Sequence, residues 1–144
     1  MKRIFALLLL TILSSPIWML TACTSNGTPH EISMAPASAV PAEMQRAPIR
    51  IREAYQFALA YPEALKNVPC FCGCVKLGHT SNYDCYIQDA PNNGPVVFDQ
   101  HALGCTICVD ITQDVIRMTR EGRAPPAIHR AIVSQYSQFG PSNQ

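Results

Sequence analysis

The sequence predicts a small, mainly α-helical single domain of about three to five helices that carries a cysteine-rich ligand loop. Apolar residues recur at three- and four-residue steps on both sides of the cysteines, which is typical of amphipathic helices. No segment shows the sustained alternation of a half-buried strand. Six of the seven cysteines and two of the four histidines lie between Pro69 and Asp110. We therefore expect the chemistry of the protein to be concentrated in this stretch.

Residues 1–22 are typical of a bacterial lipoprotein signal peptide. Lys2 and Arg3 precede an apolar run from Ile4 to Leu13, which is too short to span a bilayer. The order Leu20-Thr21-Ala22-Cys23 matches a lipobox, in which cleavage leaves an acylated cysteine as the new N-terminus. An ordinary secretory signal with a nearby cysteine is the alternative. The sequence thus predicts an extracytoplasmic (periplasmic) protein, lipid-anchored to a bacterial membrane through Cys23, where disulfides can persist.

Residues 23–48 are expected to form a flexible tether. Four prolines lie among small and polar residues without any helical or strand period. Such a composition buries too little apolar surface to offset its chain entropy. We expect the domain, residues 49–140, to fold without this tether. The processed chain carries nine basic and ten acidic residues, a balance that provides no field to attract nucleic acid.

The segment Ile49–Lys66 is predicted to be a helix with a break. Ile51, Tyr55 and Leu59 recur on one face, and Pro62 interrupts the pattern. Because proline removes a hydrogen bond inside a helix but is tolerated in a first turn, we expect a kink at Tyr61 and a short restart.

The sequence Pro69-Cys-Phe-Cys-Gly-Cys74 predicts a tight loop that brings three thiols together. Proline and glycine favour the sharp turns that this requires. A disulfide between cysteines two positions apart is strained, so any bridges from this loop would reach other cysteines. His79 and Cys85 then bracket a polar loop suited to ligands, and residues 88–95 form a surface loop.

A helix from Asp99, its N-cap, to a stop at Gly122 is predicted to carry three more ligand-type residues. At about 100° per residue, His101, Cys105 and Cys108 fall within about 60° of one another on the apolar side. They therefore face the interior and the cysteine loop. A last helix opens at Arg123, with apolar residues at Ile128, Ile132, Tyr136 and Phe139 and an end at Gly140.

Three interpretations of these side chains stay open: a metal site, a disulfide framework, and thiol redox chemistry or inert packing. Val109 follows Cys108, so attachment of c-type haem is not supported. Cys105 and Cys108 have the spacing of a redox motif, but no βαβ pattern surrounds them. No nucleophile triad, phosphate loop or carboxylate pair occurs, so we expect no enzyme, with thiol redox activity left open.

At these residues the chain resembles the bacterial lipoproteins known for a PCYCGC motif. The similarity rests on three stretches: 69–74, with phenylalanine in place of the tyrosine, 78–85, and 98–110. It covers the chain from Ile49 onward. That family has no settled biochemical function, so the resemblance implies that the six cysteines and two histidines act as one unit and names no metal.

The sequence favours soft-metal binding, with copper(I) first and zinc second, because thiolate and imidazole select these ions over hard cations. The expected ligands are Cys70, Cys72, Cys74, His79, Cys85, His101, Cys105 and Cys108. The expected partners are the membrane and a protein that delivers or accepts metal, with no nucleic acid. A disulfide-stapled interaction module, a structural zinc domain and an extracytoplasmic thiol oxidoreductase remain the alternatives.

Overall fold

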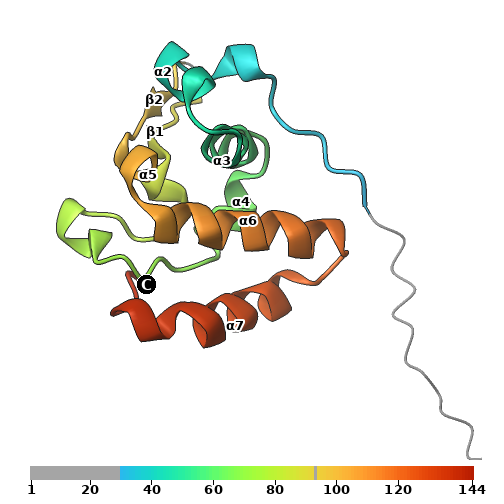
Figure 1. Ribbon diagram of the computed structural model, residues 1–144, viewed down its shortest axis with the longest axis vertical. Coiled ribbons are helices and arrows are strands. Elements are labelled where there is room, and N and C mark those ends of the chain that lie inside the picture. The colour runs from blue at the N-terminus through green and yellow to red at the C-terminus, as the bar shows by residue number, and fades with distance from the viewer. Residues whose placement is uncertain (1–29, 93) are drawn as a thin grey trace, which may run out of the picture.

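The computed structural model describes residues 30–92 and 94–144 and shows three main helices, of which α6 is the central one (Figure 1). The helix α6 lies between α3 and α7, and α2, α5 and a small hairpin lie together on one side of them. The elements are α2 (Ala42–Arg46), α3 (Ile49–Ala60), α4 (Pro62–Lys66), β1 (Ile87–Asp89), β2 (Val97–Phe98), α5 (His101–Gly104), α6 (Thr106–Arg120) and α7 (Pro125–Tyr136). The predicted signal peptide and Cys23 lie outside the described residues.

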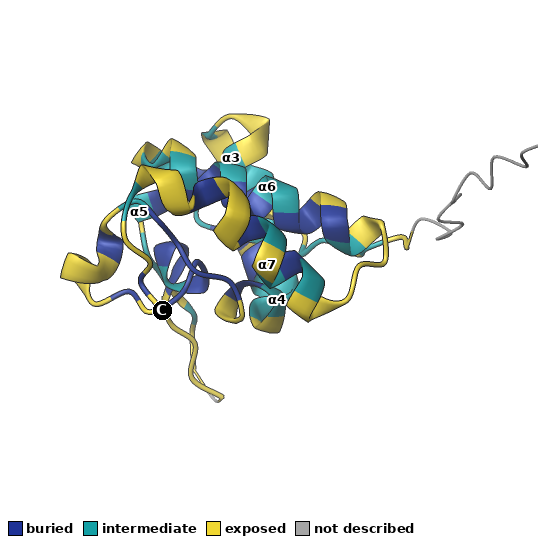
Figure 2. Ribbon diagram, turned by 90° about the horizontal axis from the view of Figure 1, so that it is seen from below, coloured by how far each residue is buried: buried dark blue, intermediate teal, exposed yellow. Residues whose placement is uncertain are grey.

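The mainly α-helical fold class is confirmed. The described residues contain six α-helices, one more than the three to five that were expected from the sequence. Three of them are only four or five residues long. Dark blue positions on α6 in Figure 2 mark its buried side, which includes Ile111, Val115 and Ile116. Burying one such side chain contributes about 1.5–3 kcal/mol, so this stripe is the main reason why α6 becomes the central helix.

Local sequence signals set most helix ends. Tyr61 leaves the helical conformation at φ −132° and ψ 57°, and Pro62 occupies the first turn of α4, as expected for a proline break. Two prolines open α7 in the same way. Gly122 follows α6 with φ 70°, the left-handed conformation that ends many helices.

The hairpin β1–β2 is the one part of the described chain with strand structure. It is antiparallel, pairs Ile87 with Phe98 and has an irregularity between Ile87 and Asp89. The backbone N–H of Asp99 then donates to the Tyr86 carbonyl at 2.9 Å. The Tyr55 hydroxyl donates to the Asp99 carbonyl at 2.8 Å, so the hairpin and α3 together fix the chain directly before His101.

The structure differs from the expected tether for residues 30–48. This segment contains a 3-10 turn and α2, and it packs against the domain instead of leaving it. Met44 is 0% exposed and Val40 is 3% exposed, so both belong to the core. Backbone hydrogen bonds join His30 to the Arg120 carbonyl at 2.8 Å and Ala35 to the Gln56 carbonyl at 3.4 Å. A domain boundary at Ile49 would therefore divide the hydrophobic core.

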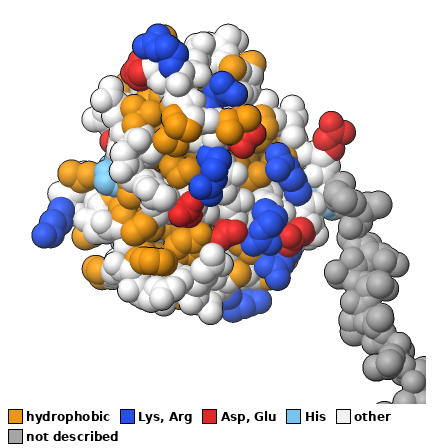
Figure 3. All heavy atoms as spheres, viewed as in Figure 1, with side chains coloured by type: hydrophobic (Ala, Val, Ile, Leu, Met, Phe, Trp, Pro, Cys, Tyr) orange, Lys and Arg blue, Asp and Glu red, His pale blue; other side chains and the backbone are white. Residues whose placement is uncertain are grey.

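The surface carries side chains of both charges. On the face in Figure 3, lysine and arginine side chains lie intermixed with aspartate and glutamate. Ion pairs at the surface include Arg50 with Asp110 at 2.8 Å and Arg117 with Glu121 at 2.8 Å. Within the described ranges, no helix combines the length and the hydropathy that crossing a membrane requires.

Candidate metal centre

The loop after α4 folds back on itself at two glycines. Gly73 and Gly78 have φ of 82° and 85°, a left-handed conformation that side chains disfavour. Between them, residues 74–77 form a 3-10 turn, and before them the Cys70 and Phe71 side chains are buried. These two reversals turn the thiols of Cys70, Cys72 and Cys74 toward a common interior, as the sequence predicted.

The helix expected from Asp99 to Gly122 is not continuous. It breaks at Cys105, whose backbone is extended at φ −113° and ψ 100°, so that α5 ends at Gly104 and α6 begins at Thr106. Glycine is a poor helix former, which favours a break at this position. The Asp99 carboxylate accepts a hydrogen bond from the His101 backbone N–H at 2.7 Å and so anchors the start of α5.

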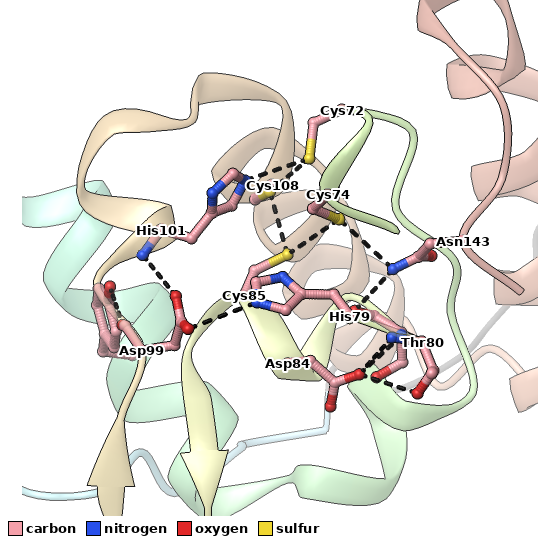
Figure 4. Close-up of polar contacts among 12 residues, drawn as sticks. Cys72, Cys74, His79, Thr80, Asp84, Cys85, Asp99, His101, Cys108 and Asn143 are labelled. Atoms are coloured by element: carbon pink, nitrogen blue, oxygen red, sulfur yellow. Dashed lines mark hydrogen bonds and ion pairs between the residues drawn. The ribbon is translucent and has the colours of Figure 1, made fainter. Parts of the chain in front are cut away.

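Despite the break, His101, Cys105 and Cys108 lie close together, and the thiols of the loop lie in contact with them. Cys108 lies at the middle of this group (Figure 4). Its sulfur is 3.3 Å from the sulfurs of Cys70 and Cys85, 3.2 Å from that of Cys105 and 3.5 Å from that of Cys72. We refer to the following seven residues as the Cys/His cluster: Cys70, Cys72, Cys74, Cys85, His101, Cys105 and Cys108.

The cluster contains two overlapping sets of four possible ligand atoms. In each set all four atoms lie within 4.8 Å of one another, a spacing close enough to hold a metal ion. One set is Cys70, Cys72, Cys74 and Cys85, and the other is Cys72, His101, Cys105 and Cys108. The His101 Nε2 atom reaches the cluster through the Cys72 sulfur at 3.3 Å.

The six described cysteines are free thiols, and no disulfide joins them. Their closest sulfur–sulfur distance is 3.2 Å, between Cys105 and Cys108, whereas a disulfide bond is about 2.05 Å long. Sulfurs arranged tetrahedrally around an ion with bonds of about 2.3 Å lie roughly 3.8 Å apart. The sulfur–sulfur contacts of 3.2–3.9 Å lie nearer to this spacing than to a disulfide bond, and the disulfide framework considered from the sequence is not found among these residues.

His79 is beside the cluster and belongs to neither set of ligand atoms. It is 7% exposed, its Nε2 atom is 3.4 Å from an Asp99 carboxylate oxygen, and its ring meets the His101 ring edge-on at 5.4 Å between centroids. Asp99 contacts both residues, since it also accepts the His101 backbone N–H. His79 thus helps to position the segment that carries His101, and its predicted role as a ligand stays a prediction.

A buried hydrogen-bond network fixes the backbone of Cys108. The Tyr86 hydroxyl donates to the Cys108 carbonyl at 2.8 Å, and the Thr112 hydroxyl donates to the Tyr86 oxygen at 2.7 Å. The Asn82 side-chain amide donates to Thr112 at 2.7 Å. Such supporting hydrogen bonds hold ligands in a defined geometry before any ion binds. In the loop, the Asp84 carboxylate plays a similar part by accepting the backbone N–H of Thr80 at 2.6 Å.

Asn143, close to the C-terminus, closes the cluster on its buried side. Its side-chain oxygen accepts the Cys70 backbone N–H at 2.6 Å, and its amide donates to the Cys74 sulfur at 3.5 Å and to the Ser81 carbonyl at 3.2 Å. Its own backbone N–H donates to the Cys70 carbonyl at 3.2 Å. Sequence reasoning missed this residue because an asparagine in a short polar tail has no periodic or motif signal.

The crowded thiols influence one another's acidity. Hydrogen bonds with Cys108 and Cys85 lower the pKa of Cys70, whereas the hydrogen bond with Cys105 raises the pKa of Cys108. A hydrogen bond with Cys85 lowers the pKa of Cys72 to about 5, and one with Cys108 lowers that of Cys105 to about 7. Thiolates are the metal-binding form of cysteine, and the lowered pKa values favour this form at Cys70, Cys72 and Cys105.

Fold and site together define a small helical domain built around a cluster of thiols and one imidazole whose ligand atoms lie close enough to hold a metal ion. The sequence profile described as a protein of unknown function with a PCYCGC motif matches residues 19–142. The chain belongs to this PCYCGC family, as its motifs predicted. No curated protein and no solved structure matches the chain.

Proposed function

We propose that this protein binds copper(I) through the Cys/His cluster and handles the metal outside the cytoplasm. The observation that supports this function is the convergence of six free thiols and one imidazole, contributed by the loop, the 3-10 turn at 83–85, α5 and α6. Soft thiolate ligands favour copper(I), and a site with six sulfurs and one nitrogen is rich in them. Zinc is the second candidate, because it accepts the same ligand types.

Unequal exposure of the ligands favours metal transfer over a purely structural role. Cys72, His101 and Cys105 are partly exposed, whereas Cys70, Cys85 and Cys108 are 0% exposed. An ion bound at the partly exposed edge is accessible to the ligands of a second protein. The proposed partners are therefore proteins that deliver or accept copper(I) by exchange of thiolate or imidazole ligands.

The proposal is tested by anaerobic titration of the purified full-length protein with copper(I) and with zinc, each against a competing chelator. We expect copper(I) to bind with a dissociation constant well below micromolar and more tightly than zinc. Replacing both Cys105 and Cys108 with serine removes two of the four ligands in one set and is expected to lower the amount of copper(I) that the protein binds. His129→Ala is the control, because its imidazole binds the Asn67 carbonyl, outside the cluster. Binding weaker than micromolar, together with three native disulfides found by mass spectrometry, would refute the proposed metal binding. It would support a disulfide-stapled interaction module instead.

We also propose that acylated Cys23 anchors the protein to a bacterial membrane. The support is the basic, apolar and lipobox order of residues 2–23. Cys23→Ser is expected to release the protein into the soluble fraction and to leave it without label from a radioactive fatty acid, since the substitution removes the acylated sulfur. Cys72→Ser keeps Cys23 and should stay bound to the membrane. A serine variant that remains acylated and sediments with membranes would refute the anchor.

A further inference from the structure

The Cys/His cluster contains more ligands than one soft-metal ion uses. A tetrahedral centre takes four ligands, as in structural zinc sites. Two such centres that share one thiolate require seven donor residues, and the two overlapping sets contain seven. Centres with fewer ligands, which copper(I) accepts, fit within the same seven residues. The number of donors therefore suits two ions that lie close enough to share a ligand.

Cys72 is the residue common to both sets. Its sulfur lies 3.4 Å from the Cys70 sulfur in the first set and 3.3 Å from the His101 Nε2 atom in the second. A thiolate sulfur has several lone pairs and can bind two cations at once. Cys108 brings the two sets together from the other side, since its sulfur is 3.3 Å from both Cys70 and Cys85.

We propose that the cluster holds two soft-metal ions bridged by the Cys72 thiolate. Cys70, Cys74 and Cys85 complete the inner site, and His101, Cys105 and Cys108 complete the outer site. This arrangement rests on the metal binding proposed above and defines its stoichiometry. Each ion that binds displaces to solvent the protons of the thiols that ligate it. Sharing Cys72 lets two cations offset the repulsion among thiolates that are packed this closely.

The two sites differ in their contact with solvent. Cys70 and Cys85 are 0% exposed and Cys74 is 2% exposed, and Asn143 covers this side through its hydrogen bonds to Cys70 and Cys74. The outer ligands His101 and Cys105 are partly exposed. We therefore expect the inner ion to be retained and the outer ion to exchange rapidly with a chelator or a partner protein.

Native mass spectrometry of the full-length protein, loaded anaerobically with copper(I) and separately with zinc, measures the stoichiometry. We expect two ions per wild-type chain. Cys105→Ser should lose the outer ion and Cys74→Ser the inner ion, so each should retain one. Cys23→Ser is a matched control for cysteine replacement outside the cluster and should retain two. X-ray absorption should show a metal–metal scattering path in the wild type and none in the variants that hold one ion.

The kinetics of removal by excess chelator provide an independent readout. The wild type should release one ion fast and one slowly, Cys105→Ser only a slow ion, and Cys74→Ser only a fast ion. One ion per wild-type chain, or two ions without a metal–metal path, would overturn the bridged pair and leave the proposed metal binding intact. An absence of bound metal would instead overturn the proposed function. If Cys74→Ser does not fold, the wild-type stoichiometry and scattering path still decide.

Discussion

Copper(I) at saturation is expected to raise the thermal unfolding midpoint of the apo-protein by roughly 15 °C or more. A ligand present at about 1,000 times its dissociation constant stabilises the folded state by about 4 kcal/mol. In a domain of this size each kcal/mol moves the midpoint by roughly 4 °C. The effect is large because the donors are adjacent only in the fold: Cys70 and Cys108 lie 38 positions apart in sequence and 3.3 Å apart in space. The unfolded chain therefore has no preformed site for the ion.

Scanning calorimetry under anaerobic conditions, with and without copper(I), measures this shift. The variant with serine at both 105 and 108 should show a smaller copper-dependent shift, because it lacks two outer ligands and keeps the four thiols of the inner site. His129→Ala should show the full shift, since its side chain lies outside the cluster. A wild-type midpoint that is unchanged by saturating copper(I) would show that binding and folding are not coupled.

Met44→Ala is expected to destabilise the domain by about 2–5 kcal/mol, the usual cost of truncating a buried methionine. Met44 is fully buried although it precedes the domain boundary drawn from the sequence, and α2 packs against α3. Truncation leaves a cavity that rigid neighbours cannot fill completely. The midpoint should fall by well over 5 °C, and deletion of residues 30–47 should have a larger effect still.

Chemical denaturation of Met44→Ala and of Glu43→Ala provides the comparison. Glu43 is the exposed neighbour on the same short helix, and its replacement should change the free energy of unfolding by no more than about 0.5 kcal/mol. Equal stability of the two variants would support the flexible tether that was expected from the sequence. It would also mean that residues 30–48 do not contribute to the core.

The sequence was sufficient where local chemistry decides the structure. Pro62 ends α3 at Ala60 because proline cannot continue the hydrogen-bond ladder, whatever surrounds it. The apolar residues of α6 follow the helical period, so its buried face could be predicted. The candidate ligands could also be predicted from the sequence, because cysteine and histidine are the residue types that bind soft metals.

Structural features that have no local sequence pattern were either not predicted or predicted differently from what the structure shows. The strands β1 and β2 have only three and two residues, too few for an alternation to be recognised. Residues 30–48 have the composition of a spacer, yet Val40 and Met44 find apolar partners in the core. The break at Cys105 preserved the convergence of His101 and Cys108 that was expected from one continuous helix.

The sequence by itself determined that this protein has a helical frame and a concentrated set of cysteine and histidine side chains, the types that bind soft metals. Only the tertiary structure decided which ligands meet, that the thiols form two sets joined at Cys72, and that His79 lies beside them. It also decided that Asn143 covers Cys70 from 73 positions away along the chain. The physical reason is that helix period and proline breaks act over a few residues, whereas these contacts depend on how α3, α6 and α7 pack together.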